Sequence, residues 1–244
     1  MKNILFFSCL FLTICLLAQK QECYVINAMG QRQKAMAVKA DSQGNLTVQI
    51  DDRLKVPYKA GSYKFAFIPK PKEINELEKL LSEEEYEELI TASATVFDAY
   101  KYLGWADAIA ALQYEAFLAT GKPEKAHDVY QLALKFPHDN NLKIQRMHLM
   151  ELVTQQQYDI IEQEAKKLIL SKDDSLAAFA FNLRGLAYEA KGQKKEAVVE
   201  YLKTVLLFDG KGKTKRERDK ARLKAIALMK ELKDPRVTYI ETIK

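Results

Sequence analysis

The sequence predicts a mainly α-helical protein: an α-α superhelix of about four helical hairpins and a capping helix, preceded by a small antiparallel β-domain. Two observations predict this fold. Small and apolar residues recur every 35 or 36 positions between residues 72 and 210, and a fixed period of this length is typical of stacked helical repeats. Before residue 69, apolar residues alternate with polar ones, which is typical of half-buried strands.

The first 18 residues are interpreted as a secretory signal peptide. Lys2 precedes an uncharged, apolar run from Ile4 to Leu17, and Ala18 is followed by polar residues. This run is shorter than the roughly 20 apolar residues that a membrane-spanning helix needs. An uncleaved anchor is the alternative interpretation. We therefore expect an exported protein that is periplasmic or associated with the cell envelope.

Removal of the signal peptide leaves 244 − 18 = 226 residues. Of Cys9, Cys15 and Cys23, only Cys23 remains, so a packed core must stabilise the fold without a disulfide within the chain. The formal net charge falls from +5 to +4 because Lys2 leaves with the signal. This small excess, together with export, argues against a nucleic acid as the partner.

Residues 20–69 are predicted to form the small antiparallel β-domain. Two alternating runs flank the turn-rich residues 41–45 and predict a hairpin. In all we expect four or five strands in a meander or a partly open barrel, closed by the segment Ile68–Pro71 because proline donates no ladder hydrogen bond. The predicted strands with the clearest patterns are Cys23–Ala28, Met36–Ala40, Leu46–Ile50 and Tyr63–Phe67.

The helical period is visible at several offsets. Ala126, Ile161 and Ala197 are spaced by 35 and 36 residues, and each is preceded by a turn position five residues earlier. The turn positions are Gly121, Gln156 and Gly192; the positions four residues after the first set are Tyr130, Ala165 and Tyr201; those three residues further on are Ala133, Leu168 and Thr204. A step of 36 back from Ala126 gives Ile90, with Ala94 and Phe97 at the matching offsets.

One unit shows a known pattern. Gly185, Tyr188, Gly192, Ala197 and Tyr201 resemble the tetratricopeptide repeat, which has a Gly and a Tyr in its first helix, a Gly at the turn, and an Ala and an aromatic residue in its second helix. The unit with Gly121, Ala126 and Tyr130 is similar. The likeness covers residues 72–210 and implies a superhelix of stacked hairpins whose first helices line a concave groove.

The other two units depart from the pattern. Gln156 stands at the turn and Ile161 at the small position of the third unit, and the first unit keeps only the apolar frame of Leu81, Tyr86 and Ile90. In physical terms a small Ala lets two helices approach, and the aromatic residue fills the space one turn later. Four matching sets of offsets favour stacked repeats over an irregular helical bundle.

The C-terminal part is predicted to be a basic capping helix over residues 211–232 and an extended tail over residues 233–244. Ala221, Ala225 and Leu228 give the helix an apolar stripe. Val237–Ile240 is interpreted as a final short strand. The eight basic residues between Lys211 and Lys224 are interpreted as a solvated face rather than as a site for an anionic partner or a membrane surface.

The sequence predicts no catalytic, cofactor-binding or metal-binding residues. His127, His138 and His148 lack metal-ligand spacing and a partner cysteine. No glycine-rich phosphate loop and no nucleophile motif is present. In the acidic run from Glu83 to Glu88, Ser82 and Glu85 are interpreted as a capping box at a helix start rather than as a cation site.

These features lead to three hypotheses. The first is an exported, non-enzymatic scaffold within a cell-envelope complex, which binds a peptide or a partner protein in its groove. The second is a structural accessory of outer-membrane assembly, secretion or wall synthesis that docks through the β-domain. The third is an enzyme with an unrecognised site. The positions that the resemblance places in the groove are Glu115, Lys143, Arg146, Met150, Phe179, Asn182 and Glu189.

Overall fold

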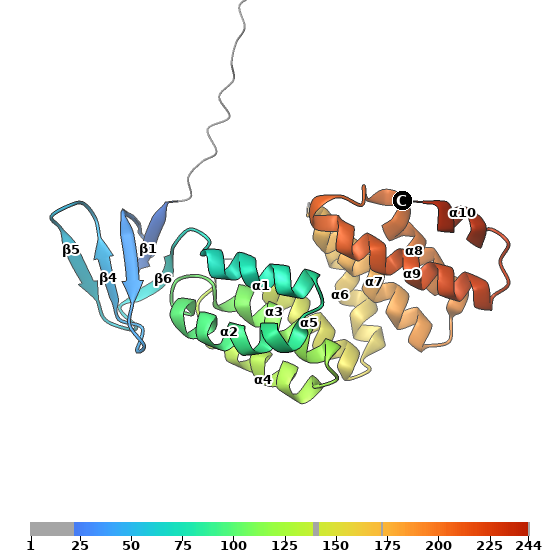
Figure 1. The fold of residues 1–244 in the computed structure, drawn as a ribbon, viewed down its shortest axis with the longest axis horizontal. Coiled ribbons are helices and arrows are strands. Elements are labelled where there is room, and N and C mark those ends of the chain that lie inside the picture. Colours follow the sequence, from blue (N-terminus) through green and yellow to red (C-terminus); the bar gives the residue numbers. More distant parts are fainter. Residues whose placement is uncertain (1–21, 139–141, 172, 244) are drawn as a thin grey trace, which may run out of the picture.

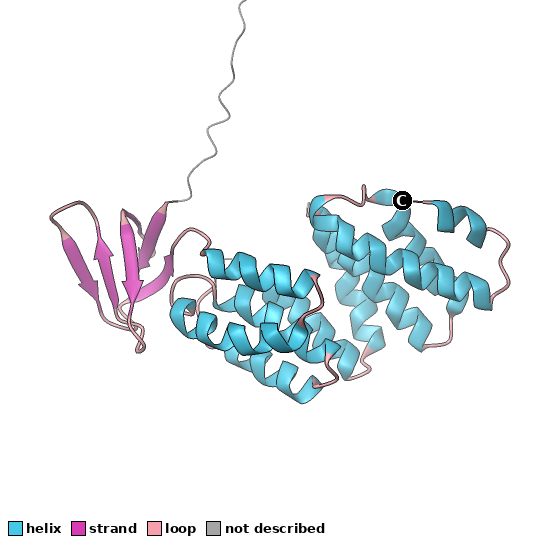
Figure 2. Ribbon diagram, viewed as in Figure 1, coloured by secondary structure: helices cyan, strands magenta, loops and turns pink. Residues whose placement is uncertain are grey.

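The computed structural model describes residues 22–138, 142–171 and 173–243. The protein is mainly helical, and a small region of antiparallel sheet precedes the helices (Figures 1 and 2). The strands occupy one end of the elongated molecule and the C-terminal helices occupy the other. The predicted signal peptide, residues 1–18, lies outside the described residues.

Six strands form two three-stranded antiparallel sheets, with the orders β2-β1-β6 and β3-β4-β5. The predicted hairpin is confirmed, because β3 and β4 pair with Val38 opposite Val48 and Ala40 opposite Leu46. The strands are β1 (Cys23–Asn27), β2 (Arg32–Ala35), β3 (Ala37–Ala40), β4 (Leu46–Gln49), β5 (Lys55–Tyr58) and β6 (Tyr63–Phe67).

Among the described residues there are therefore more strands than the four or five predicted. β2 is mostly polar and β5 contains Pro57, so neither shows a strong strand pattern. β2 leads into β3 through a bend at Met36. The side chain of Met36 is 59% exposed, so its assignment to the buried side of an alternating strand is wrong.

The β-region packs directly on the helices. Val25, Leu46 and Val48 are buried in one apolar cluster with Leu103, which lies between the second and third helices. The indole Nε1 of Trp105 donates a hydrogen bond of 3.0 Å to the carbonyl oxygen of Ile68. Sheet and helices therefore share a core instead of being joined only by the chain.

Gly104 permits this contact. Its φ is +83°, and a Cβ atom there would lie 3.0 Å from the carbonyl oxygen of Ala66 and from the rings of Phe65 and Phe67. A larger residue would therefore suffer backbone strain as well as a steric clash with β6.

Ten helices follow in the part of the chain that the structure describes, apart from one short 3₁₀ turn at Gly212–Thr214. They are α1 (Lys72–Ser82), α2 (Tyr86–Tyr100), α3 (Ala106–Ala119), α4 (Pro123–Ala133), α5 (Leu142–Thr154), α6 (Tyr158–Ile169), α7 (Asp174–Ala190), α8 (Lys194–Leu207), α9 (Lys215–Glu231) and α10 (Val237–Thr242). Each helix packs on the next, α3 also touches α1 and α5, and α9 touches α7.

The same tight turn joins the two helices of four successive pairs. Glu84, Gly121, Gln156 and Gly192 all have positive φ, between 58° and 75°. At each turn the N–H of the next residue donates to the carbonyl oxygen five positions earlier, over 2.8 to 2.9 Å. This is the glycine-type helix C-cap. The turns are spaced by 37, 35 and 36 residues, so the predicted period corresponds to a repeated local structure.

The first spacing corrects the first unit by one position. The sequence pattern placed Ile90 and Ala94 at the packing positions of α2, but Leu89 and Ser93 are fully buried there, whereas Ala94 is exposed. The turn preceding α2 lies at Glu84. Two adjacent apolar residues, Leu89 and Ile90, fit a helical period equally well, and therefore the side-chain pattern alone did not fix the phase.

The capping box predicted for Ser82 and Glu85 is wrong. Ser82 is the last residue of α1, and its hydroxyl donates to the carbonyl oxygen of Lys79 instead of accepting from the start of α2. Glu85 itself is the residue that precedes α2, and its side chain makes no capping hydrogen bond. The left-handed turn at Glu84 closes the corner through backbone hydrogen bonds, so no serine cap is needed.

The predicted final strand is also wrong, because residues 237–242 form α10. A fifth turn of the same kind precedes it: Lys233 has a φ of 54°, and the N–H of Asp234 donates to the carbonyl oxygen of Met229. Arg236 hydrogen-bonds to Asp234 and lowers the pKa of that carboxyl to about 2. α9 is thus followed by a short second helix, and Ile240 is buried against it.

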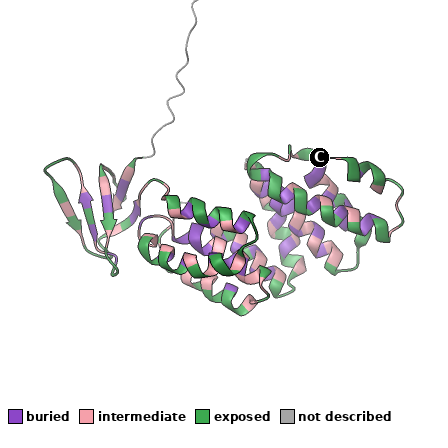
Figure 3. Ribbon diagram, viewed as in Figure 1, coloured by how far each residue is buried: buried purple, intermediate pink, exposed green. Residues whose placement is uncertain are grey.

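The buried residues are concentrated in the interior between the packed helices, as Figure 3 shows. Ala126, Ile161 and Ala197 are fully buried. Gly185 is in direct contact with the ring of Tyr201, since a Cβ at Gly185 would lie 2.6 Å from Cε1 of that ring. The glycine therefore gives α7 and α8 the close approach that the aromatic residue then fills.

Replacement of Ala197 by Leu should lower the free energy of unfolding by ~1–3 kcal/mol, because the added carbons have no space between α7 and α8. Chemical denaturation measures the change. Ala126→Leu should behave alike, and Ala119→Leu, at an exposed position of α3, should cost much less. Equal tolerance at all three positions would contradict the packing described here.

The turn residues give a second, reciprocal prediction. Gln156→Gly should stabilise the protein by about 1 kcal/mol, because glycine adopts a positive φ without the strain that glutamine suffers. Gly121→Gln should destabilise it by a similar amount, since no atom lies near enough to clash. Melting temperatures of the two variants should move in opposite directions; a shift of the same sign would refute the shared turn geometry.

Candidate functional site

The seven predicted groove residues come from three helices. Glu115 lies on α3, residues 143, 146 and 150 lie on α5, and residues 179, 182 and 189 lie on α7. Five of them, Glu115, Arg146, Phe179, Asn182 and Glu189, contact one another or residues of α9. We call these five residues, with Arg216, Glu217 and Lys224 of α9, the inner-face cluster.

Glu217 is the centre of the inner-face cluster. Its Oε1 accepts a hydrogen bond of 2.6 Å from Nη2 of Arg146, and its Oε2 accepts one of 3.0 Å from Nδ2 of Asn182. The same amide nitrogen donates to the carbonyl oxygen of Glu217 over 2.9 Å. Glu217 is only 6% exposed, so two donors from two other helices satisfy a buried carboxylate.

Phe179 orients the arginine. The guanidinium carbon of Arg146 lies 4.0 Å from the centroid of the Phe179 ring, which is a cation–π contact. The apolar anchor predicted in the groove thus supports a charged side chain, and the ring itself is only 6% exposed.

Two further ion pairs flank this centre. Arg216 pairs with Glu115 of α3, and Nζ of Lys224 lies 3.1 Å from Oε1 of Glu189. Glu189 also accepts a hydrogen bond of 3.0 Å from the hydroxyl of Tyr201. Burial and the negative charge of Glu189 raise the pKa of the Tyr201 phenol, so this hydroxyl stays protonated and donates.

The two remaining predicted residues lie apart from the cluster. Nζ of Lys143 is 4.0 Å from Oδ2 of Asp107 and 5.9 Å from the centroid of the Trp105 ring. Met150 is partly buried and packs on apolar side chains on both sides of α5. Both therefore serve contacts between helices.

The residues of α9 were missed by the sequence analysis. A signal was present: Glu217 and Lys224 each lie 35 residues after Asn182 and Glu189, which is one repeat period. One further step of the repeat would have placed α9 as another first helix rather than as a cap.

Most of the basic run has partners within the protein. Lys215 pairs with Asp219 at 2.7 Å, Arg218 donates through Nε to the carbonyl oxygen of Val205, and Arg222 does so to that of Ile240. Arg216 and Lys224 belong to the inner-face cluster. These contacts stabilise the fold. They also leave fewer cationic side chains available to bind an anionic surface.

A second polar group joins α3, α4 and α5. Glu151 of α5 is 6% exposed; it accepts a hydrogen bond of 2.9 Å from the Tyr114 hydroxyl and lies 2.6 Å from Nδ1 of His127. Burial and the charge of Glu151 raise the pKa of the Tyr114 phenol. The group links three helices, with a neutral phenol as a fixed donor.

The other two histidines lie elsewhere. Nδ1 of His148 is 3.5 Å from the Tyr130 hydroxyl, and Nδ1 of His138 is 3.1 Å from the carbonyl oxygen of Phe136. Within the described ranges, no group of three His, Cys, Asp or Glu side chains is placed to hold a metal ion.

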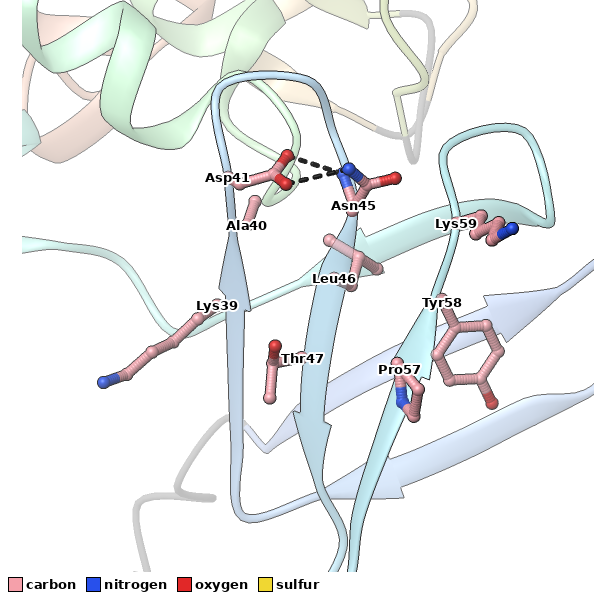
Figure 4. Close-up of a pocket in the computed structure, with 9 residues that line it drawn as sticks. All are labelled: Lys39, Ala40, Asp41, Asn45, Leu46, Thr47, Pro57, Tyr58 and Lys59. Carbon is pink, nitrogen blue, oxygen red and sulfur yellow. Dashed lines mark hydrogen bonds between the residues drawn. The ribbon is translucent and has the colours of Figure 1, made fainter.

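The β-region carries an open pocket of about 310 Å³ on the sheet β3-β4-β5. Figure 4 shows its lining, which includes Lys39, Thr47, Pro57 and Lys59. At one end, Oδ2 of Asp41 accepts a hydrogen bond of 2.8 Å from Nδ2 of Asn45. This surface has two cationic side chains beside apolar carbons.

No helix in the described ranges has both the length and the apolar character needed to cross a bilayer. Comparisons of the chain with models of protein families, with curated proteins and with solved structures each find no match. The likeness to the tetratricopeptide repeat therefore stays a prediction from the residues of this chain.

Tyr114→Phe should lower the free energy of unfolding by about 1–2 kcal/mol, because Glu151 then loses a donor in a buried site. Urea denaturation measures the loss. Tyr130→Phe is the matched control: its hydroxyl is 3.5 Å from the His148 nitrogen, and its removal should have little effect. An unchanged stability of Tyr114→Phe, or an equal loss in the control, would contradict a specific role of the Tyr114 hydroxyl at the buried carboxylate.

Proposed function

We propose that this protein is an exported, non-enzymatic interaction scaffold. In this proposal the helices form a superhelix of tetratricopeptide-like hairpins, whose inner face holds a peptide or a partner protein within a cell-envelope complex. No cofactor, metal or nucleic acid takes part. The N-terminal 18 residues act as the export signal.

One observation carries the proposal: the same backbone turn recurs at Glu84, Gly121, Gln156 and Gly192, at intervals of 35 to 37 residues. Helix pairs of one geometry stack with a constant rotation and create an extended concave surface. The contacts of α3 with α1 and α5, and of α9 with α7, support such stacking of first helices.

The chemistry of the inner face supports protein binding rather than catalysis. The inner-face cluster contains four acidic or amide side chains, Glu115, Asn182, Glu189 and Glu217, and three cationic ones. A surface of mixed charge suits a peptide that offers both signs of charge.

The β-region pocket favours a second candidate, a structural accessory of the envelope that docks through its sheet. Lys39, Thr47 and Lys59 of this pocket are exposed. A partner bound there would use the β-region and leave the helices free for another contact.

Site-specific photocrosslinking in cells separates the two candidates. A photoreactive amino acid at Lys143, on α5, should give a discrete adduct with a partner if the helical inner face binds it. The same residue at Thr47, in the β-region pocket, should give that adduct if the sheet binds it. Lys195, an exposed residue of α8, is the control and should give none.

The positions that form an adduct decide between the two candidates. An adduct at Lys143 alone supports the scaffold proposal, and an adduct at Thr47 alone supports docking through the sheet. Equal labelling at Lys195 would refute a defined inner-face site.

A further inference from the structure

The inner-face cluster joins helices that are not neighbours. Arg146 of α5 contacts Glu217 of α9 across α7, and Glu115 of α3 contacts Arg216 of α9 across both α5 and α7. In a stack of helix pairs, a first helix ordinarily touches only the adjacent first helices. These two ion pairs therefore bring together opposite ends of the inner face.

From this geometry we propose that the inner-face cluster is a polar latch, which holds the concave surface closed and must be released before a partner can enter. The proposal rests on the proposed function for its biological role. The latch itself is a property of this chain and can be measured without a partner.

The apolar core is divided at the place where such an opening would occur. One buried cluster extends over α1 to α5 and includes Ile144 and Met147, and another extends over α5 to α7 and includes Leu149 and Leu152. Helix α5 contributes buried residues to both clusters, and the partly buried Met150 packs against both of them. Motion of α6–α10 relative to α1–α4 would therefore be centred on α5, where the contacts of Met150 are shared between the two clusters.

The composition of the latch suits reversible opening. Apart from the cation–π contact of Arg146 with Phe179, its contacts are ion pairs and amide hydrogen bonds, whose groups would be hydrated when separated. Opening would therefore expose one aromatic ring and otherwise mostly polar groups. An apolar contact of the same extent would lose its burial energy on opening. The structure thus closes the inner face with the type of contact that water can replace.

The position of α9 is itself fixed by the preceding loop. A Cβ at Gly210 would lie 2.3 Å from Nη1 of Arg218, so this arginine passes directly over the loop and donates to the carbonyl oxygen of Val205. Asp209 accepts a hydrogen bond of 3.0 Å from the hydroxyl of Thr214. These contacts fix the first turn of α9, and therefore they also fix the positions of Arg216 and Glu217 relative to α3 and α5.

In the closed state the charged groups of the inner face already have partners. An incoming peptide must therefore supply a cation that replaces Arg216 beside Glu115, or a carboxylate that replaces Glu217 beside Arg146. A peptide with neighbouring basic and acidic residues has the required chemistry, since Arg216 and Glu217 are adjacent in the sequence.

The test is a distance measurement by pulsed electron spin resonance on the full chain. Cys9, Cys15 and Cys23 are replaced by Ser, and spin labels are attached at Glu124→Cys on α4 and Lys220→Cys on α9, both exposed. The otherwise unchanged protein should give one narrow distribution of distances.

Charge reversal at the more exposed ion pair then opens the latch. Glu115→Arg and Arg216→Glu each place like charges together and should shift the mean distance by about 10 Å, the diameter of one helix. The double variant restores opposite charges and should return the narrow distribution. Lys215→Glu is the matched control: it breaks an exposed pair within α9 and should leave the distances unchanged.

Unchanged distances in both single variants would overturn the latch, as would an equal shift in the control. The helical circular dichroism of each variant distinguishes opening from unfolding. Loss of this circular dichroism in the single variants, without recovery in the double variant, would also contradict the latch. Failure of the photocrosslinking experiment leaves these distances unaffected, so the two proposals fail separately.

Discussion

The close approach of paired helices at small side chains is the constraint on which the helical part of this protein depends. Ala126 and Ala197 have no exposed surface, and Gly185 leaves room for the ring of Tyr201. Larger residues at these positions would separate the helices and open the apolar clusters on both sides. The tight left-handed turns within four of the pairs serve the same arrangement, because they let the chain reverse over very few residues.

Much of this arrangement could be predicted from the sequence. The recurrence of Gly121, Gln156 and Gly192 located three of the corners, although Gln156 is not a glycine. The corner at Glu84 was missed because a glutamate carries no turn signal, and the adjacent apolar residues Leu89 and Ile90 left the phase open. Residues 237–242 have strand-forming side chains, but burial of Ile240 against α9 favours a helix there.

The candidate site was predictable in its positions but not in its partners. Five of the predicted groove residues contact one another or α9, since the repeat template specifies which side of a helix faces inward. Their contacts with Arg216 and Glu217 join residues up to 216 − 115 = 101 positions apart. No local pattern reports such pairs, because they depend on how strongly the stack curves.

The closed inner face has a general consequence for binding. Where internal groups occupy a site, the observed affinity for a ligand is reduced by the fraction of molecules in the open state. A weak apparent affinity would then reflect the cost of opening rather than poor contacts. The same competition favours partners that replace several internal contacts at once.

The contact between the β-region and the helices has a practical consequence. Trp105 is the single tryptophan of the chain, and its indole lies 5.8 Å from the centroid of the Phe67 ring and donates to the carbonyl of Ile68. Indole emission depends on local polarity, so the tryptophan fluorescence of this protein, excited selectively over its tyrosines, originates entirely at that junction. Any event that separates the sheet from α3 is therefore visible optically without an added dye.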